Sequence, residues 1–209
     1  MLRSFLIIDD FFANPHEVRR AALAMNYPAP AAGENYPGRM SAERGLWPNI
    51  DQMFSMIIGE PVRGNFKHLH GFFRLTGASD SGAADIHIDV DNVWAGVIYL
   101  NPPEQCQGGT QFFRHKKYGT DHAPVREEDF KIYGAGNRLE VLQKTIVPDG
   151  RDRDKWEMTM TLPMRWNRLV LFRSWFWHTA GPGFGASNDD MRLVQLMFFE
   201  SAPPAPPRR

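Results

Sequence analysis

The sequence predicts a mainly β fold of the α+β class, a β-barrel or sandwich with helices packed on one side. Many short β-rich runs are separated by Gly, Pro and Asn clusters. They follow an N-terminal part whose apolar residues recur at helical spacing. The length of 209 residues, with 43% hydrophobic and 23% charged residues, suits one soluble domain with its own core. We therefore expect a single domain over residues 1–200.

The N-terminal part is expected to hold one strand and two helices. Residues 5–8 form a short apolar run typical of a buried strand. Asn14 followed by Pro15 is a helix-start signal, because Asn caps the helix and Pro fits its first position. Residues 48–58 are amphipathic, and Gly59 follows as a C-terminal cap. These helices are the elements expected to cover one side of the β-structure.

The remaining chain is expected to be mostly strands. They are predicted at residues 66–75, 84–88, 93–100, 111–114, 140–146, 157–162, 168–173 and 193–199. The charged segment 115–160 interrupts this series, and we interpret much of it as an insertion or a flap over the active-site mouth. The Pro-rich residues 201–209 are expected to form an extended, disordered tail.

Charge and cysteine content exclude several functional classes. Lys plus Arg and Asp plus Glu both number 24, so the formal net charge is zero. This argues against a nucleic-acid partner bound through bulk charge and against a polybasic membrane anchor. The single Cys106 excludes an internal disulfide and a Cys-rich zinc site. We expect a cytoplasmic protein without a membrane partner, and we leave a homodimer open.

The best candidate for chemistry is the His87-Ile88-Asp89 segment. In a strand, residues i and i+2 point to the same side, so the imidazole and the carboxylate could bind one ion. Asp91 is an alternative to Asp89, and such a pair also occurs as a simple hydrogen-bonded surface pair. Downstream, an apolar strand leads to His178, and Arg192 opens another. Two histidines and one carboxylate leave metal positions open, as non-haem Fe(II) requires.

Other polar residues carry weaker signals. His68 and His70 form a second metal-like pair, but no acidic residue follows at useful spacing, so a strand surface or a substrate contact is preferred. His115 and His122 lie in the charged segment and are expected to be solvated.

Three arginines are candidates for binding an anion. Arg192 begins an apolar strand, where a buried charge without a partner would be costly, so an anionic ligand is favoured over a plain surface position. Arg74 and Arg173 are candidates for binding a substrate carboxylate.

The order and spacing of these features over residues 84–199 resemble the Fe(II)- and 2-oxoglutarate-dependent dioxygenases, in particular their prolyl-hydroxylase-like branch. The matching features are His87-x-Asp89, the strand ending at Asn101, Gly108-Gly109-Thr110, the strand 169–172 leading through Ser174 to His178, and Arg192. The resemblance implies a double-stranded β-helix (jelly-roll) core with His87, Asp89 and His178 as iron ligands. It also implies that Arg192 binds the distal carboxylate of 2-oxoglutarate, with Tyr99 donating a hydrogen bond to the same group.

The activity implied by this resemblance uses Fe(II), O2 and 2-oxoglutarate as co-substrate. It would hydroxylate an unactivated C–H of a small molecule, amino acid or peptide side chain and release succinate and CO2. One alternative is a cupin-like metalloenzyme that uses no 2-oxo acid and has no need of Arg192 as an anion clamp. Another is a non-catalytic jelly-roll binding module. Residues 114–165 follow no family pattern, so the resemblance assigns no substrate residues there.

Overall fold

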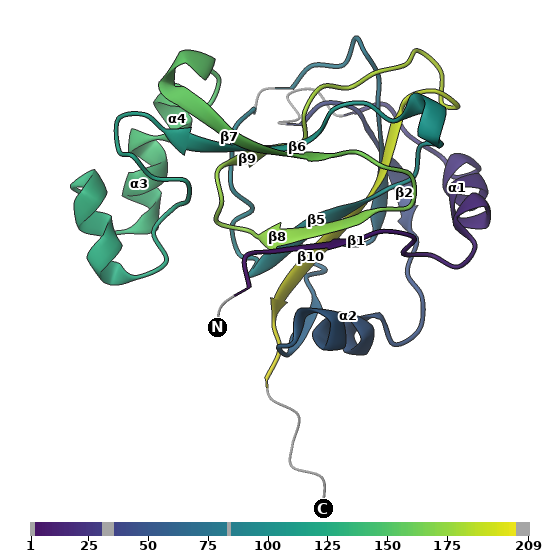
Figure 1. Cartoon of the computed structure of the whole chain (residues 1–209), viewed down its shortest axis with the longest axis horizontal. Helices are drawn as coiled ribbons and strands as arrows, with labels where there is room; N and C mark the ends of the chain where they lie inside the picture. The colour runs from purple at the N-terminus through teal and green to yellow at the C-terminus, as the bar shows by residue number, and fades with distance from the viewer. Residues whose placement is uncertain (1–2, 31–35, 83–84, 204–209) are drawn as a thin grey trace, which may run out of the picture.

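Two antiparallel sheets form the body of the molecule, and a computed structural model describes residues 3–30, 36–82 and 85–203. Figure 1 shows the small sheet lying over the large one, with α2 on the far side of the large sheet, α3 and α4 at one end of the molecule and α1 at the other. The mainly β prediction is confirmed, and the strand pairs of both sheets are antiparallel.

The large sheet has seven strands in the order β1-β8-β5-β10-β4-β2, with β3 also paired to β10. Its strands are β1 (Phe5–Ile8), β2 (Arg39–Arg44), β3 (Val62–Gly64), β4 (Phe72–Thr76), β5 (Trp94–Tyr99), β8 (Leu169–Arg173) and β10 (Arg192–Ser201). The small sheet has the order β7-β6-β9, from β6 (Gly109–His115), β7 (Trp156–Pro163) and β9 (His178–Thr179). The helices are α1 (Pro15–Leu23), α2 (Ile50–Ile58), α3 (Arg138–Lys144) and α4 (Ile146–Asp149), with 3-10 turns at Pro103–Gln105, Glu127–Tyr133 and Arg153–Lys155.

The central strands of the large sheet are buried on both faces, which explains their continuous apolar sequences. In β10, Leu193 and Met197 pack toward α1 and α2, whereas Val194 and Leu196 face the small sheet. Because side chains alternate along a strand, Arg192 lies on the same face as Val194 and Leu196. The space between the two sheets therefore receives the side chain of Arg192.

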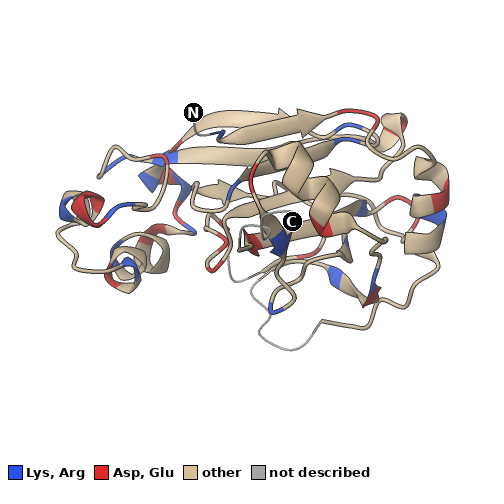
Figure 2. Ribbon diagram, turned by 90° about the horizontal axis from the view of Figure 1, so that it is seen from below, with Lys and Arg blue, Asp and Glu red and all other residues tan. Residues whose placement is uncertain are grey.

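The charged segment folds into helices and turns around its own apolar core. That core joins Val141 of α3, Tyr133 and Trp156 to Ile86 and Ile88, the neighbours of His87. Figure 2 shows Lys and Arg mixed with Asp and Glu along the ribbon, as the balanced charge predicts. The segment contacts the predicted metal-binding strand directly, and its role as a flap remains a prediction.

The largest error of the sequence prediction is the strand at residues 140–146, which is helix α3. The Asn137 side chain accepts a hydrogen bond from the Glu140 backbone N–H at 3.0 Å and caps this helix. The prediction took the apolar residues Val141, Leu142 and Ile146 as strand residues and overlooked the Asn-x-x-Glu start signal.

Other boundaries also differ from the prediction. The strand expected at 84–88 is reduced to an isolated bridge at His87, and residues 83–84 lie outside the described part. The strand expected at 66–75 begins only at Phe72, because residues 66–71 form turns that end at Gly71 with a φ of 82°. Strands β2, β3 and β9 were not predicted.

The predicted tail begins inside the last strand. Ser201 ends β10, and the Ala202 N–H donates to the Pro61 carbonyl at 3.1 Å. Residues 204–209 of the predicted tail lie outside the described part. Among the described helices, none has the length and apolar character needed to cross a membrane.

Candidate metal centre

The His87–Asp89 segment keeps the alternation of a strand although it is not part of a ladder. Ile86 and Ile88 are buried in the apolar core beside α3, at 1% and 7% exposure. His87 and Asp89 therefore face the opposite side. The backbone is held by hydrogen bonds from Ile86 N to Gly150 O and from Asp89 N to Ser174 O, both 3.0 Å.

His178 is brought to this segment by strand β9. On one side it pairs with Phe112 of β6, and on the other it exchanges two backbone hydrogen bonds with His87, at 2.9 and 3.0 Å. The backbone of His178 is thus fixed from both sides. The two histidine rings lie 4.4 Å apart between centroids, with their planes tilted by 51° to each other.

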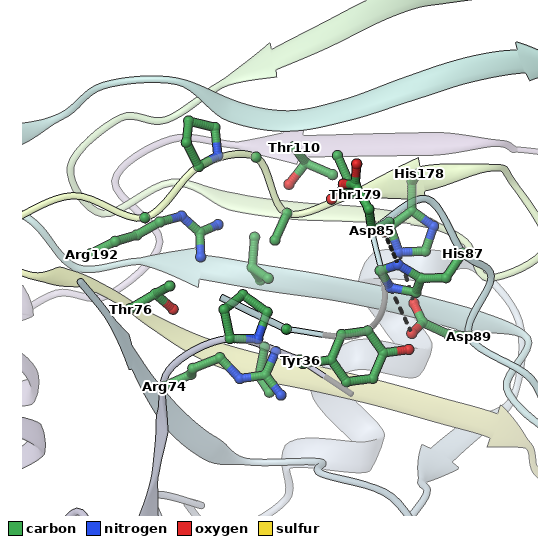
Figure 3. A pocket seen from close by; sticks show the side chains of 18 of the residues that line it. Tyr36, Arg74, Thr76, Asp85, His87, Asp89, Thr110, His178, Thr179 and Arg192 are labelled. Carbon is green, nitrogen blue, oxygen red and sulfur yellow. Dashed lines mark hydrogen bonds and ion pairs between the residues drawn. The ribbon is translucent and has the colours of Figure 1, made fainter. Parts of the chain in front are cut away.

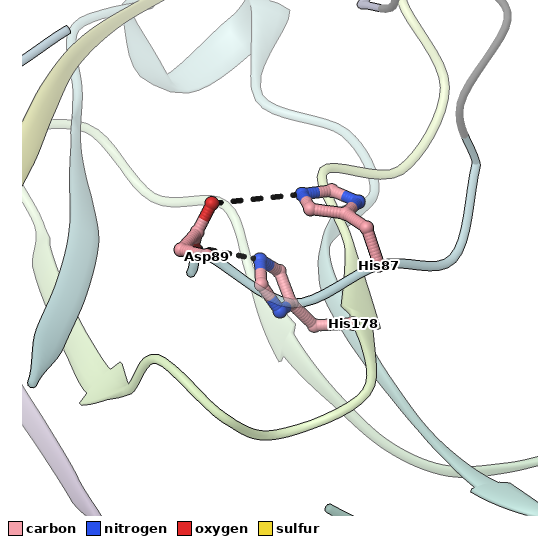
Figure 4. A group of neighbouring side chains, drawn as sticks. All are labelled: His87, Asp89 and His178. Carbon is pink, nitrogen blue, oxygen red and sulfur yellow. Dashed lines mark ion pairs between the residues drawn. The ribbon is translucent and has the colours of Figure 1, made fainter. Parts of the chain in front are cut away.

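His87, Asp89 and His178 meet at one point, as Figure 4 shows. The His178 Nε2 lies 3.2 Å from Asp89 Oδ2, and the His87 Nε2 lies 3.8 Å from Asp89 Oδ1. One ligand atom from each residue lies within 4.8 Å of the others. Among the described residues, this is the group of three His, Cys, Asp or Glu side chains that could hold a metal ion.

The other ring nitrogen of each histidine is bound to the backbone. His87 Nδ1 lies 2.8 Å from the Asp85 carbonyl, and His178 Nδ1 lies 2.9 Å from the Phe176 carbonyl. A carbonyl only accepts, so each Nδ1 donates its hydrogen to the backbone, and the Nε2 of each ring faces Asp89. Such backbone partners are typical of metal-binding histidines, since they fix the tautomer and the ring orientation.

The protonation states of His87 and Asp89 also favour the binding of a cation. Burial lowers the pKa of His87 to about 4, with His178 acting in the same direction against Asp89. Burial raises the pKa of Asp89, but His178, His87 and Arg74 outweigh it, so the pKa lies below its usual range. Near neutral pH His87 is therefore neutral and Asp89 is charged, which are the forms that bind metal.

The triad opens into a cavity of about 390 Å³ between the two sheets, drawn in Figure 3. Arg192 lines the same cavity on the far side from the histidines and is only 3% exposed. Its Nη2 has no hydrogen-bond partner in the described part of the chain. Burial lowers the pKa of Arg192, while Tyr99 raises it. A buried guanidinium with an unused donor is a site for an anion, because leaving it unpaired is costly.

Tyr99 lies beside Arg192 but not at the cavity surface. Its ring centre is 5.7 Å from the Arg192 Cζ. Its hydroxyl accepts the Thr110 backbone N–H at 3.0 Å and contacts the Thr110 Oγ1 at 2.8 Å. Thr110 itself lines the cavity. The predicted contact between Tyr99 and a co-substrate carboxylate remains a prediction, with Thr110 as the residue between Tyr99 and the cavity.

The chain matches the family described as Family of unknown function (DUF6445) over residues 2–182. It belongs to the DUF6445 family. No curated protein matches the sequence.

The fold of this DUF6445 chain is similar to the folds of three solved structures. It is similar to SnoK, a non-heme alpha ketoglutarate dependent carbocyclase from nogalamycin biosynthesis, with a TM-score of 0.56, 12% identity and coverage of 96% of this chain and 80% of SnoK. HygX from Streptomyces hygroscopicus, solved with nickel and 2-oxoglutarate bound, is similar with a TM-score of 0.52 and 10% identity. The match covers 95% of this chain and 83% of HygX. SnoN, a non-heme alpha ketoglutarate dependent epimerase from nogalamycin biosynthesis, is similar with a TM-score of 0.50 and 14% identity. The match covers 95% of this chain and 79% of SnoN. At these identities the likeness shows a shared fold.

Several residues considered from the sequence lie elsewhere in the DUF6445 structure. Asp91 is exposed in a left-handed turn with a φ of 62°, outside the triad. Arg173 is paired with Glu60 at 2.7 Å, whereas Arg74 lines the cavity. His70 is fully buried, and its Nδ1 accepts the Phe198 N–H at 3.1 Å.

His115 is not solvated, contrary to prediction. It is fully buried, with its Nε2 3.0 Å from Asp149 Oδ2 and its ring edge-on to Trp156 at 4.5 Å. His122, the other histidine of that segment, is partly exposed. The charged neighbours of His115 suggested a surface position, but strand alternation in β6 turns Arg114 outward and His115 inward.

Sequence reasoning missed other cavity residues of this DUF6445 chain. Tyr36 packs edge-on against His87 at 4.8 Å, yet it lies in a stretch predicted only as loop. Thr76 lines the cavity from the end of β4, two residues after Arg74 and on the same face. Period-two alternation from Arg74 was the signal that could have identified Thr76.

Proposed function

We propose that this protein is an Fe(II)- and 2-oxoglutarate-dependent oxygenase, of the prolyl-hydroxylase-like branch, that hydroxylates an unactivated C–H. The observation that carries the proposal is that one cavity holds both a site for a cation and a site for an anion. The His87–Asp89–His178 triad fits a divalent cation, and the buried Arg192 across the cavity fits a carboxylate. The shared fold with SnoK, HygX and SnoN supports it.

The triad residues fit iron by their chemistry. Two imidazoles and one carboxylate form the facial set that leaves coordination positions open in non-haem Fe(II) oxygenases. When bound, the iron supplies the redox chemistry by which O2 and the 2-oxo acid oxidise the substrate, with release of succinate and CO2. The proposal includes a double-stranded β-helix as the arrangement of the two sheets around this site.

The protein's own residues bind, orient and exclude water. His87 and His178 hold their Nε2 atoms toward Asp89 through their backbone-bound Nδ1 atoms. Arg192 would bind the distal carboxylate of 2-oxoglutarate, and Thr110, held by Tyr99, lies on the same cavity wall. Phe172, Leu196 and other apolar side chains close the cavity between the sheets and limit access of water.

Arg192 favours this proposal over the two alternatives. A cupin-like metalloenzyme without a 2-oxo acid needs the triad but not a buried arginine with an unused donor. A non-catalytic binding module needs neither the backbone hydrogen bonds that orient the two rings nor two imidazole Nε2 atoms that converge on Asp89. Both features occur together in this cavity.

Succinate formation is the direct test of the proposal. Purified protein with Fe(II), O2 and 2-oxoglutarate is screened against amino acids, peptides, nucleosides and other small molecules. Succinate release is measured for each, and the mass of each product is determined by mass spectrometry. We expect succinate release stimulated by one substrate group, with a product heavier by one oxygen atom. Turnover without 2-oxoglutarate, or binding of the co-substrate without any succinate from any class, would contradict the proposal.

A further inference from the structure

The cavity contains a second arginine that the co-substrate does not require. Arg74 lies on β4, where its register partner on β10 is Val194, two residues beyond Arg192. Along β4, Phe73 and Leu75 point into the core at 2% and 0% exposure, so Arg74 and Thr76 face the cavity. The two arginines thus line one wall of the cavity from neighbouring strands, as Figure 3 shows.

The ring of Tyr36 contacts both Arg74 and the triad residue His87. The guanidinium carbon of Arg74 lies 5.3 Å from the Tyr36 ring centre, and the same ring packs against His87 at 4.8 Å. The Arg74 Nε also donates to the Met40 sulfur at 3.1 Å. These two contacts help to orient the guanidinium. A group bound to Arg74 would therefore lie beside the Tyr36 ring and close to the triad.

The charge of the cavity favours an anion there. Three aspartates also line the cavity: Asp85 binds Arg153 at 2.6 and 2.8 Å, Asp89 belongs to the triad, and Asp80 accepts the Gly77 N–H. Arg74, Arg151 and Arg192 line the same cavity. With a divalent cation bound as well, the cavity attracts anions.

We infer that the substrate of this protein carries a carboxylate, which Arg74 binds beside Tyr36 while the carbon to be oxidised lies at the triad. The inference rests on the proposed function and specifies its substrate class as small organic acids, including amino acids or the carboxylate end of a peptide. The planar guanidinium matches the two oxygens of a carboxylate in a way that a lysine could not. Arg74 would then select the substrate, whereas Arg192 would bind the co-substrate.

Matched acid and amide probes test this assignment without knowledge of the natural substrate. Nickel-loaded protein, saturated with 2-oxoglutarate, is titrated with phenylacetate and with phenylacetamide, which differ in charge but not in shape. We expect the wild type to prefer the acid, and Arg74→Gln to lose roughly tenfold or more in affinity for the acid with little change for the amide. Arg74→Lys should recover only part of the preference, because the forked geometry is lost.

Two further variants serve as controls. Arg39→Gln removes a charge from neighbouring strand β2, where Arg39 binds Asn188, and should leave the acid preference unchanged. Arg151→Gln removes the other arginine that lines the cavity near the triad. Melting temperatures of all variants show that each is folded before its affinity is compared.

Three results would overturn the inference. They are equal binding of acid and amide by the wild type, retained acid preference in folded Arg74→Gln, and loss of the preference in Arg151→Gln instead. Failure of the proposed function is separate, since it appears as absence of 2-oxoglutarate binding in the wild type. In that case the acid and amide comparison is repeated on the nickel-loaded protein alone.

Discussion

The Nε2 of His178 lies 3.2 Å from Oδ2 of Asp89, although the two residues are 89 positions apart in the chain. The contact is produced by the backbone bridge between His178 and His87, which places a short strand of the small sheet beside the His87–Asp89 segment. Removing one of these side chains should therefore affect metal binding more than folding.

His87→Ala is expected to lose metal retention while the fold persists. The variant removes one imidazole of the triad, and the remaining pair holds a cation much more weakly, by about tenfold or more. The measurement is metal content after dialysis against Fe(II) or Ni(II), together with calorimetric affinity. His68→Ala is the matched control, because His68 lies outside the triad and should leave metal content unchanged. Metal retained by His87→Ala but lost from His68→Ala would contradict the assignment.

Arg192→Leu is expected to keep or raise the stability of the ligand-free protein. Arg192 is buried and its Nη2 is unpartnered among the described residues, so the charge is costly until an anion binds. The free energy of unfolding in urea should stay equal or rise by about 1 kcal/mol. Addition of 2-oxoglutarate with Ni(II) should then stabilise the wild type more than the variant. A variant that is strongly destabilised without ligand would indicate that Arg192 is mainly structural.

His70 is expected to make the fold less stable in mild acid. Burial lowers the pKa of His70 from 6.5 to about 4 in the folded protein, so the unfolded chain binds a proton more readily. Its contribution to the free energy of unfolding is complete above pH 6.5 and is lost progressively as the pH falls toward 4. Near pH 5 the loss is roughly 2 kcal/mol. Urea unfolding of His70→Gln should show a flatter dependence on pH than the wild type, and an identical dependence would exclude His70 as the cause.

The helical segment beside the triad is expected to become more ordered when the cavity fills. The core around α3 includes Ile86 and Ile88, and Ile86 donates its N–H to Gly150 just after α4. Amide hydrogen exchange in α3 and α4 should therefore slow on addition of Ni(II) and 2-oxoglutarate, with β5 as an internal reference. Exchange in both helices as slow as in β5, with no change on addition, would contradict a flap role.

The metal triad was accessible to sequence reasoning because its signals are local. His87 and Asp89 are two residues apart, and an apolar strand leads toward His178. Alternation kept His87 and Asp89 on one face even though the expected strand is only an isolated bridge. Arg192 was indicated by a charge at the start of a buried strand.

The parts that escaped prediction depend on long-range packing. Tyr36 reaches His87 from a loop, and no periodic pattern marks such a residue. His115 is buried because β6 and α4 meet around its pairing with Asp149, which the charged local sequence conceals. Helix α3 was mistaken for a strand because its apolar residues suit either structure until the Asn137 cap is considered.

The central claim is that the triad and Arg192 bind 2-oxoglutarate together. Isothermal titration of 2-oxoglutarate into the Ni(II)-loaded wild type, the metal-free wild type, Arg192→Leu and Asp89→Ala tests it directly. Tight binding is predicted for the loaded wild type alone, with a loss of roughly tenfold or more in each of the other three samples. Equal affinity in all four samples, or no binding to the loaded wild type, would contradict the account.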